Sequence, residues 1–391
     1  MTPGFLKPSN PPRPFFSVIL LGCPKNRVDA ERILGTMARA GFRPCSEPAQ
    51  ARVIVVTTCA FLESARQESE TAIRRALALK SRQPDRRVVV FGCLVRHSGH
   101  KLARRFPAVD FWLGLDRIRD LPALLAGSSP PARTRTESGP RLLSTPRHYA
   151  YLRIADGCDN RCAYCLIPSI RGPLRSRPVS DIVAEARTLA DSGVRELILI
   201  AQDTTAYGND SRTGTTLAGL LDRLSRIPGI DWLRLMYAHP AHLGEDVLDQ
   251  LASNPKLCRY IDLPIQHVSN RILQAMNRHY TRADLELCLE QLHAVPDIHI
   301  RTTVITGFPG ETQAEFRELL DFVRAARFDR LSGFAFSPEA GTPAAKLPGQ
   351  VPAGIRAARL RHIMHEQASV SRRNLRRLVG REIEVIVDSP G

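Results

Sequence analysis

The sequence alternates short apolar runs with longer segments in which apolar residues recur at helical spacing. This alternation constrains the fold strongly, because parallel strands need a long crossover between them and a helix usually supplies it. In the first part of the chain we expect strands at 16–22, 53–56 and 88–91, separated by helices at 27–40 and 64–80. This part is predicted to form an open parallel α/β domain.

The same alternation returns after residue 148 and continues to residue 336. Strand candidates alternate there with helical patterns in six units, which suits an open or partial TIM-like (β/α)6 barrel. In such barrels the chemistry takes place at the C-terminal ends of the strands. The strand candidates are 151–155, 196–201, 232–237, 260–264, 299–306 and 330–336, and the helical ones include 181–191, 217–226, 284–293 and 314–325.

At 391 residues the chain is too long for one ordinary core, and its composition suggests where it divides. Residues 353–377 read as a basic helix, and a new strand pattern at 382–387 is too short to be a domain. The predicted parts are a disordered, Pro-rich extension (1–14), the first α/β domain (15–126), a linker rich in Gly, Ser, Pro and Arg (127–147), the barrel (148–378) and a final short segment (379–391).

Charge and cysteine content limit the class of protein. The formal net charge of +16 favours a polyanionic partner such as nucleic acid or the ribosome, although an arginine-rich proteome would give the same excess. No apolar run reaches membrane-spanning length, and the polar start lacks the apolar centre of a signal peptide. We therefore expect a cytoplasmic protein without membrane contact, whose nine cysteines are metal ligands and buried thiols, not disulfides.

Three cysteines at close spacing follow the first strand candidate of the barrel. Cys158, Cys162 and Cys165 are near enough in sequence to share one metal centre, and three thiolates leave a cubane iron–sulfur cluster with one iron open for chemistry. The alternative is a zinc site, which would need a fourth ligand. Since no Cys or His lies between Cys165 and His239, that ligand would have to come from far along the chain.

A second set of three cysteines lies at the ends of the first three strand candidates. Cys23, Cys59 and Cys93 each follow an apolar run. Ligands collect beyond the carboxyl ends of the strands in an open parallel sheet, so the three thiols should meet at one edge. Each could instead be a small buried hydrophobic residue, as cysteine often is. The repetition at three strand ends favours a second metal cluster.

Cys-x3-Cys-x2-Cys with an aromatic residue, Tyr164, before the last cysteine resembles the cluster loop of radical S-adenosylmethionine (SAM) enzymes. The resemblance implies that Cys158, Cys162 and Cys165 hold a 4Fe–4S cluster whose open iron binds SAM. In that superfamily an electron from the cluster cleaves SAM, and a deoxyadenosyl radical then removes hydrogen from an unactivated carbon.

Further segments narrow the resemblance to the methylthiotransferase family. In its RimO branch the substrate is the β-carbon of an aspartate in small-subunit ribosomal protein twelve. The segments similar to that branch are 21–26, 167–172 and 201–208, and those that fit the wider family are 263–267, 301–303, 307–311 and 337–342. Thr57 and Ala238–His239 depart from the family pattern without removing a cysteine.

The resemblance implies two 4Fe–4S clusters, with Cys23, Cys59 and Cys93 holding the auxiliary one, which would carry the transferred sulfur. Two SAM molecules are then consumed, one as methyl donor and one as radical source. The final segment, 379–391, would be the truncated start of a TRAM β-barrel. The implied partners are ribosomal protein twelve, free or in the ribosomal subunit, and separate sulfur-donor and electron-donor proteins, and the enzyme itself is expected to be a monomer.

Other residues have weaker assignments. Tyr164, Gln202 and Gly307 are expected near the cluster and bound SAM, although packing would explain Tyr164 and a turn would explain Gln202 and Gly307. Two histidines at strand ends and three further cysteines read as structural or inert groups. These are His239, His267, Cys45, Cys258 and Cys288.

Two other functions remain open. A tRNA adenosine methylthiotransferase would use the same chemistry on a different substrate, and residues 23–26 and 201–208 argue against it. A non-catalytic metal-containing protein could bind RNA through its charge, but six thiols in two sets at strand ends argue against that class.

Overall fold

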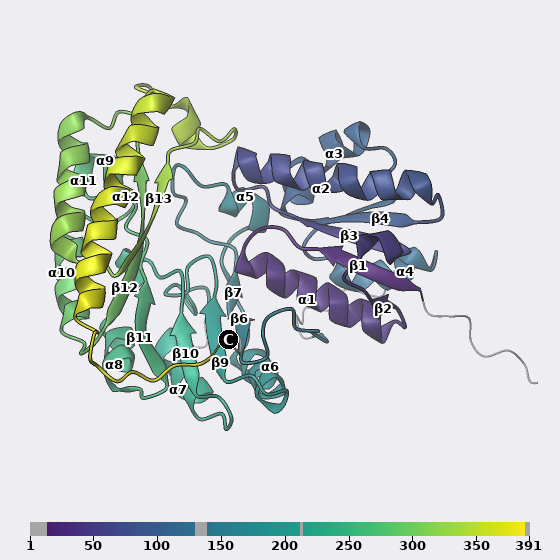
Figure 1. Ribbon diagram of the computed structural model, residues 1–391, viewed down its shortest axis with the longest axis horizontal. Coiled ribbons are helices and arrows are strands. Elements are labelled where there is room, and N and C mark those ends of the chain that lie inside the picture. Colours follow the sequence, from purple (N-terminus) through teal and green to yellow (C-terminus); the bar gives the residue numbers. More distant parts are fainter. Residues whose placement is uncertain (1–13, 130–138, 212–213, 388–391) are drawn as a thin grey trace, which may run out of the picture. The chain divides into compact units, whose positions relative to one another are not determined.

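The computed structural model describes residues 14–129, 139–211 and 214–387. The chain forms two compact units that divide between Ser144 and Thr145 (Figure 1). The predicted N-terminal extension falls almost entirely on residues 1–13, which lie outside the described residues. In the part of the chain that the structure describes, no helix is both long and apolar enough to cross a membrane.

The first unit is built on a five-stranded parallel sheet in the order β2-β1-β3-β4-β5. Its strands β3 and β4 consist mainly of Val and Ile and are almost wholly buried, as strands covered by helices on both faces must be. Val55 of β3 pairs with Val18 on one side and with Val89 on the other. The strands are β1 (Phe15–Ile19), β2 (Arg43–Pro44), β3 (Val53–Thr58), β4 (Arg87–Gly92) and β5 (Phe111–Leu113).

Helices cover both faces of this sheet, and Figure 1 shows α1 and α2 on opposite sides of it. Ile33 and Met37 of α1 pack with Phe16 and Phe91 in one hydrophobic core. Full burial of a side chain of this size stabilises the fold by roughly 1.5–3 kcal/mol. The helices are α1 (Pro24–Arg39), α2 (Glu63–Arg82), α3 (Cys93–Arg105) and α4 (Leu121–Leu125), with 3-10 turns at Pro48–Gln50 and Ile118–Asp120.

The second unit contains a six-stranded parallel sheet in the order β13-β12-β11-β10-β9-β6. The strands follow one another without a skipped position, and among the described residues β6 and β13 remain at the edges. This is the open (β/α)6 arrangement, so the predicted α/β fold with a partial barrel is confirmed. The strands are β6 (Tyr149–Arg153), β9 (Glu196–Ile200), β10 (Trp232–Leu235), β11 (Leu257–Asp262), β12 (His299–Thr306) and β13 (Arg330–Ala335), and β7 (Ala155–Asp156) forms a separate hairpin with β8 (Arg175–Ser176).

The helices of the second unit lie between successive strands, and Figure 1 shows α10, α11 and α12 along the outer side of the sheet. Capping boxes at Thr281 and Thr312 begin α10 and α11 slightly before the predicted positions, because each threonine accepts a bond from the third residue of its helix. The helices are α5 (Ile167–Arg171), α6 (Val179–Asp191), α7 (Leu217–Ser225), α8 (Glu245–Ser253), α9 (Asn270–Ala275), α10 (Arg282–His293), α11 (Gln313–Ala326) and α12 (Ala353–Arg376), with 3-10 turns at Pro240–His242 and Pro343–Lys346.

The strand predicted at residues 382–387 is wrong, because the backbone there adopts no regular structure. Alternating side chains such as Ile383 and Val385 remain exposed, and no described strand pairs with the segment. A strand is stable only when neighbouring strands take up its backbone N–H and C=O groups. Residues 379–387 therefore contain no β-structure of a TRAM barrel, and residues 388–391 lie outside the described residues.

Part of the predicted linker is attached to the first unit. The Glu31 carboxylate on α1 is fully buried and accepts hydrogen bonds from Arg141 at 2.5 Å and from the backbone and side chain of Ser144 at 2.9 and 3.0 Å. Gly35 makes room for this segment, because a Cβ there would lie 2.2 Å from the Pro140 carbonyl oxygen. Residues 139–144 thus pack on α1, while residues 130–138 of the predicted linker lie outside the described residues.

We predict that Glu31→Gln releases residues 139–144 from α1. The substitution removes the negative charge that faces the buried Arg141 guanidinium at 2.5 Å, and breaking a buried ion pair in this way costs about 3 kcal/mol. Hydrogen–deuterium exchange with mass spectrometry should show faster exchange of amides 139–144 and of the middle of α1. Glu68→Gln, on the exposed face of α2, is the control and should leave both segments protected. Equal protection in the two variants would contradict the role given to Glu31.

Candidate active site

The cysteine loop follows β6 and β7 at the carboxyl end of the barrel strands, where the sequence placed it. Gly157 begins the loop with a φ of 74° and touches the next segment so closely that a Cβ would lie 1.8 Å from the Pro173 carbonyl oxygen. Only glycine combines that backbone conformation with that contact. The loop is also fastened from elsewhere in the barrel, because Ala163 N–H donates to the Met276 carbonyl at 2.9 Å.

The three thiols of this loop are free and close enough to influence one another electrostatically. Burial raises the pKa of Cys158 to about 11 and that of Cys165 to about 12, and the neighbouring thiols add to both shifts. Two sulfurs already accept N–H groups: Cys165 Sγ from Ile167 N–H at 3.4 Å and Cys162 Sγ from Arg278 Nη1 at 3.6 Å. N–H donors aimed at sulfur fit thiolate ligands of an iron–sulfur cluster, whose sulfurs commonly accept such bonds.

A buried acid holds the base of the loop together. Asp156 lies at the end of β7 and accepts both Nη1 bonds from Arg171 at 3.2 Å. Gln202 follows β9 and donates its side-chain N–H to the same carboxylate at 3.0 Å. Its amide oxygen is buried and makes no hydrogen bond among the described residues. The Nε2 group of Gln202 is therefore fixed by Asp156, while its Oε1 atom is a hydrogen-bond acceptor without a partner among the described residues.

A small cavity of about 270 Å³ opens next to Cys158. Asp203 lines it and accepts bonds from His242 Nδ1 at 2.7 Å and Asn160 Nδ2 at 2.8 Å. Burial alone would raise the pKa of Asp203, but the hydrogen bond from His242 and the other neighbours lower it to about 2. The carboxylate is thus ionised and fixes the orientation of the His242 ring at the cavity wall.

The histidines predicted to be structural, His239 and His267, both cap turns. His239 Nδ1 accepts the Ala241 N–H at 3.2 Å, and burial together with the positive charge of Arg278 lowers its pKa to about 2. His267 Nδ1 accepts the Ser269 N–H at 3.0 Å. Each ring satisfies a backbone donor at the start of the next element, in agreement with the structural interpretation.

In the first unit the three cysteines reach the same edge of the sheet. Cys23 begins α1 after β1, while Cys59 and Cys93 follow β3 and β4 directly. Asn26 of α1 links the three positions, since its Nδ2 donates to the Leu21 and Thr58 carbonyls and its Oδ1 lies 3.7 Å from Cys93 Sγ. A Cβ added at Gly22 would lie 3.1 Å from Cys59 Cβ, so Cys23 and Cys59 are near neighbours.

The structure accounts for Tyr164 and Gly307 by packing. Tyr164 is half-buried and packs against the hydrophobic cluster that includes Ile272 and Met276, and loss of hydration raises its pKa well above the usual value. Gly307 has a φ of 71°, and a Cβ there would lie 2.2 Å from Arg356 Cγ. The glycine is thus explained by its neighbour on α12, and SAM contacts of both residues remain predictions.

Residues that the sequence did not single out complete the site. Arg278, Asp203, His242 and Asp156 all lie in contact with the cysteine loop or its supports. Asp203 and Asp156 each follow a strand closely and could have been found by that position. Arg278 follows a short helix and carries no such signal, because arginine is usually exposed and nothing in its neighbourhood marks it as buried.

Models of two families match the chain. The radical SAM superfamily matches residues 152–323, and the family described as uncharacterized protein family UPF0004 matches residues 16–114. Ribosomal protein uS12 methylthiotransferase RimO from Anaeromyxobacter sp. (strain K) is 44% identical over 376 residues, covering 94% of this chain and 80% of the relative. The enzyme of the same name from Desulforamulus reducens is 42% identical over 386 residues, covering 96% and 87%.

Solved structures agree with the fold. The radical SAM methyltransferase TsrM from Kitasatospora setae, with cobalamin and a [4Fe-4S] cluster bound, has a TM-score of 0.61 at 16% identity, covering 85% of this chain and 77% of its own. The cobalamin-dependent SAM radical enzyme OxsB has a TM-score of 0.56 at 14% identity, covering 90% and 56%. These likenesses concern the fold alone, whereas the sequence relatives are close along nearly the whole chain. The chain belongs to the RimO family of ribosomal protein methylthiotransferases.

Proposed function

We propose that this protein is a radical SAM methylthiotransferase that attaches a methylthio group to the β-carbon of an aspartate in ribosomal protein uS12. Two observations in the chain carry the proposal. One set of three cysteines outside any disulfide lies at the carboxyl end of the barrel strands, and another such set lies at the carboxyl edge of the first sheet. Methylthiotransferases of this family use two 4Fe–4S clusters and SAM, and two sets of three cysteines supply the ligands for both.

Cys158, Cys162 and Cys165 would hold the cluster that binds SAM, and Cys23, Cys59 and Cys93 the auxiliary one. When bound, these groups supply the radical that removes hydrogen from the substrate carbon and the sulfur and methyl group that replace it. The protein's own contribution is ligation, orientation and exclusion of water. Cys162 is buried, Tyr164 packs against the neighbouring hydrophobic cluster, and Asn277 steadies the loop by donating to the Arg161 carbonyl at 2.9 Å.

Gln202 is a SAM-binding candidate with a specific argument. Because its N–H group is engaged by Asp156, its unpaired amide oxygen can accept only from a ligand or water. The ammonium group of SAM is a donor of the required kind. Tyr164 and Gly307 would contribute to the form of the site without binding SAM through polar groups. Tyr164 packs against the hydrophobic cluster beside the cysteine loop, and Gly307 lets the backbone turn next to Arg356.

The substrate distinguishes this function from that of the tRNA-modifying relatives. The near-complete match to uS12 enzymes favours the protein substrate, either free or in the small ribosomal subunit. Mass spectrometry of uS12 and of tRNA from a deletion strain decides between the two. Loss of the modification from tRNA with uS12 unaffected would contradict the proposal. The sulfur donor and the electron donor are proposed to be separate proteins, and the enzyme to act as a cytoplasmic monomer.

We predict that Cys162→Ala abolishes formation of deoxyadenosine from SAM, because two thiolates cannot hold the radical cluster. The cluster of the first unit should survive, since its cysteines belong to a separate compact unit. Chromatography of deoxyadenosine and iron analysis of anaerobically reconstituted protein measure the two effects. Cys288→Ala, a buried thiol on α10, is the control and should retain full SAM cleavage. Cleavage at the rate of the unchanged protein in Cys162→Ala would refute the assignment of Cys162.

We predict a different result when Cys23, Cys59 and Cys93 are all replaced by Ala. SAM cleavage should persist because the barrel loop is intact, whereas uS12 should receive no methylthio group because no auxiliary iron remains to present sulfur. Deoxyadenosine and the mass of the uS12 peptide are measured in the same reaction. A matched triple replacement at Cys45, Cys258 and Cys288 should change neither product. Full methylthiolation by the first triple variant would end the sulfur-carrying role of those three cysteines.

A further inference from the structure

Arg278 is a buried positive charge beside a cysteine of the radical cluster. It follows α9, and only 5% of its surface is exposed. Its guanidinium donates through Nε to the Tyr280 hydroxyl at 2.9 Å, through Nη2 to the Pro264 carbonyl at 2.8 Å and through Nη1 to Cys162 Sγ at 3.6 Å. It also lies 5.1 Å from the centre of the Tyr280 ring. Its position is therefore fixed on three sides.

No Asp or Glu pairs with Arg278 in the described part of the chain, and this distinguishes it from other buried arginines of the barrel. Arg171 is paired with Asp156 at 3.2 Å, and Arg177 with Glu185 at 2.7 Å. A charge taken out of water costs several kcal/mol unless an opposite charge compensates it. The group that occupies the place of a carboxylate at Arg278 is the sulfur of Cys162.

We propose that Arg278 is the counter-charge of the radical cluster and raises its reduction potential. A cluster ligated by thiolates is anionic and gains a further negative charge on reduction. A fixed cation and an N–H bond to a ligand sulfur both favour the reduced form, since cluster potentials depend on net charge and on hydrogen bonds to sulfur. Arg278 thus acts on the step in which the cluster accepts an electron, as a positioning residue that does not touch substrate.

Electrostatics in the surroundings support this assignment. The positive charge of Arg278 helps to lower the pKa of the neighbouring His239, so that ring remains neutral and adds no second cation. The Tyr280 hydroxyl, which accepts the Nε hydrogen bond, donates its own proton to the Ile265 carbonyl at 2.7 Å and is therefore neutral. Among the groups hydrogen-bonded to the Arg278 guanidinium in the described part of the chain, only the Cys162 sulfur can carry a negative charge.

The test is the reduction potential of the radical cluster in the holoenzyme, measured by anaerobic titration with electron paramagnetic resonance. The signal that changes on addition of SAM identifies this cluster against the auxiliary one. In Arg278→Gln the ratio of reduced to oxidised cluster at a fixed applied potential should fall at least tenfold, which corresponds to about 59 mV for one electron. Arg278→Lys keeps the charge and should recover most of the ratio.

Tyr280→Phe removes the hydroxyl that orients Arg278 Nε and should lower the ratio by a smaller factor, while leaving the charge in place. Arg177→Gln is the matched control, because its charge is already compensated by Glu185, and it should leave the ratio unchanged. Arg278→Gln with full iron content and an unaltered ratio would overturn the proposal. The proposal depends on the proposed radical chemistry, but the potential is read without uS12, so failure here leaves the substrate assignment untouched.

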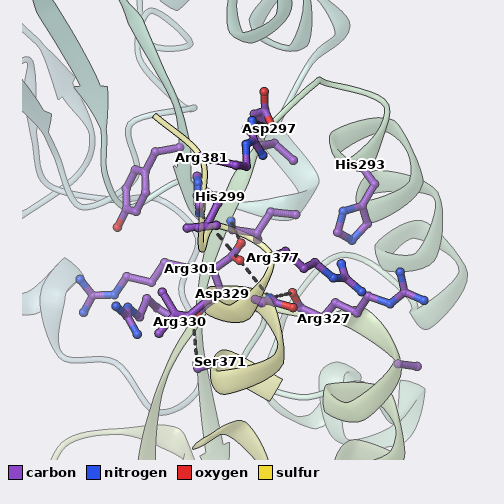
Figure 2. Close-up of a pocket in the computed structure, with 17 residues that line it drawn as sticks. His293, Asp297, His299, Arg301, Arg327, Asp329, Arg330, Ser371, Arg377 and Arg381 are labelled. Carbon is purple, nitrogen blue, oxygen red and sulfur yellow. Dashed lines mark hydrogen bonds and ion pairs between the residues drawn. The ribbon is translucent and has the colours of Figure 1, made fainter. Parts of the chain in front are cut away.

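A second proposal comes from the opposite end of the barrel. A cavity of about 740 Å³ lies where β12 and β13 begin and α12 ends (Figure 2). Both of its acids are engaged: Asp297 pairs with Arg381 at 3.0 Å, and Asp329 accepts from Asn374 and from Ile300 N–H. We name it the basic groove, and its cationic lining is Arg301, Arg327, Arg330, Arg377 and Arg381.

The side chains of three of these arginines have no polar partner among the described residues. The side chains of Arg327, Arg330 and Arg377 are exposed, and none forms a hydrogen bond or ion pair there. Arg327 caps the end of α11 and Arg377 that of α12, so both also interact favourably with a helix dipole. That explanation does not extend to Arg330, which begins β13. Guanidinium groups bind phosphate oxygens in a bidentate manner, and several together in a concave site suit an RNA backbone.

We infer that the basic groove binds ribosomal RNA, so that the enzyme docks on the small subunit and not on free uS12. This depends on the proposed substrate, since only that function brings the enzyme to an RNA-rich particle. The chain's net charge of +16 favours the same kind of partner. The inference also separates two tasks, with RNA at one end of the barrel strands and chemistry at the other.

The test compares two triple alanine variants that remove equal charge. Arg327, Arg330 and Arg377 are replaced in one, and the exposed, unpaired Arg187, Arg223 and Arg317 in the other. Affinity for unmodified small subunits is measured at several salt concentrations. The groove variant should bind at least tenfold more weakly, and the slope of log affinity against log salt should fall by about 2 to 3, since each of the three lost phosphate contacts removes roughly 0.7 to 0.9.

The control variant should bind like the unchanged protein. Methylthiolation of an isolated uS12 peptide is measured in parallel and should be equal in all three proteins, which separates failure of docking from failure of the proposed chemistry. Equal loss in both variants would show a general charge effect and overturn the groove assignment. A loss of affinity that does not depend on salt would also overturn it, because phosphate binding must release counterions.

Discussion

The requirement that three sulfurs lie close together, as proposed for each metal cluster, accounts for how both units are organised. The first unit meets it through topology: Cys23, Cys59 and Cys93 are far apart in the sequence, and a parallel sheet brings the ends of β1, β3 and β4 to one edge. The second unit meets it locally, with three thiols on one loop whose shape depends on Gly157 and on bonds from distant parts of the barrel. The cysteines of the first unit come together only when the whole sheet is folded. Those of the second unit need only the correct conformation of a single loop.

The loop is held by charges that are taken out of water. Asp156 is bound by Arg171 and Gln202, and Asp203 by His242 and Asn160. A buried polar group raises the free energy of the fold unless each of its hydrogen-bond partners is in place. Loop conformations that break one of these bonds are therefore disfavoured relative to the one that keeps them all. Two groups beside these networks lack a matching partner among the described residues: the Gln202 amide oxygen accepts no hydrogen bond, and no carboxylate pairs with the positive charge of Arg278. Both lie next to the cysteine loop or its supports.

The periodicity of the sequence was enough to predict the long buried strands, because nearly unbroken apolar runs such as residues 53–56 of β3 have few other uses in a protein of this size, whereas short strands such as β2 and β5 have too few residues to show a pattern. It also located both cysteine sets at strand ends, and their role as metal ligands stays a prediction. It was not enough for residues 382–387, where the alternating pattern is present but no neighbouring strand takes up the hydrogen bonds. Nor could it reveal Arg278 or the attachment of residues 139–144 to Glu31, because long-range pairing of buried charges leaves no trace in local composition.

The backbone at the carboxyl end of the barrel has a further consequence. Arg161, Tyr237, Gln266 and Asn277 all have positive φ values between 50° and 64°, and they lie in the cysteine loop, after β10, after β11 and directly before Arg278. A side chain in this conformation costs of order 1–3 kcal/mol, which glycine would avoid. Of the six non-glycine residues with positive φ in the described chain, these four lie at the carboxyl end, while Asp297 and Arg327 lie at the basic groove, so the larger share of this strain is on the face that carries the cysteine loop. Replacing these residues by glycine would remove the strain and raise the stability of the fold. Because the residues also shape the loops around the cysteines, the same replacements would lower activity.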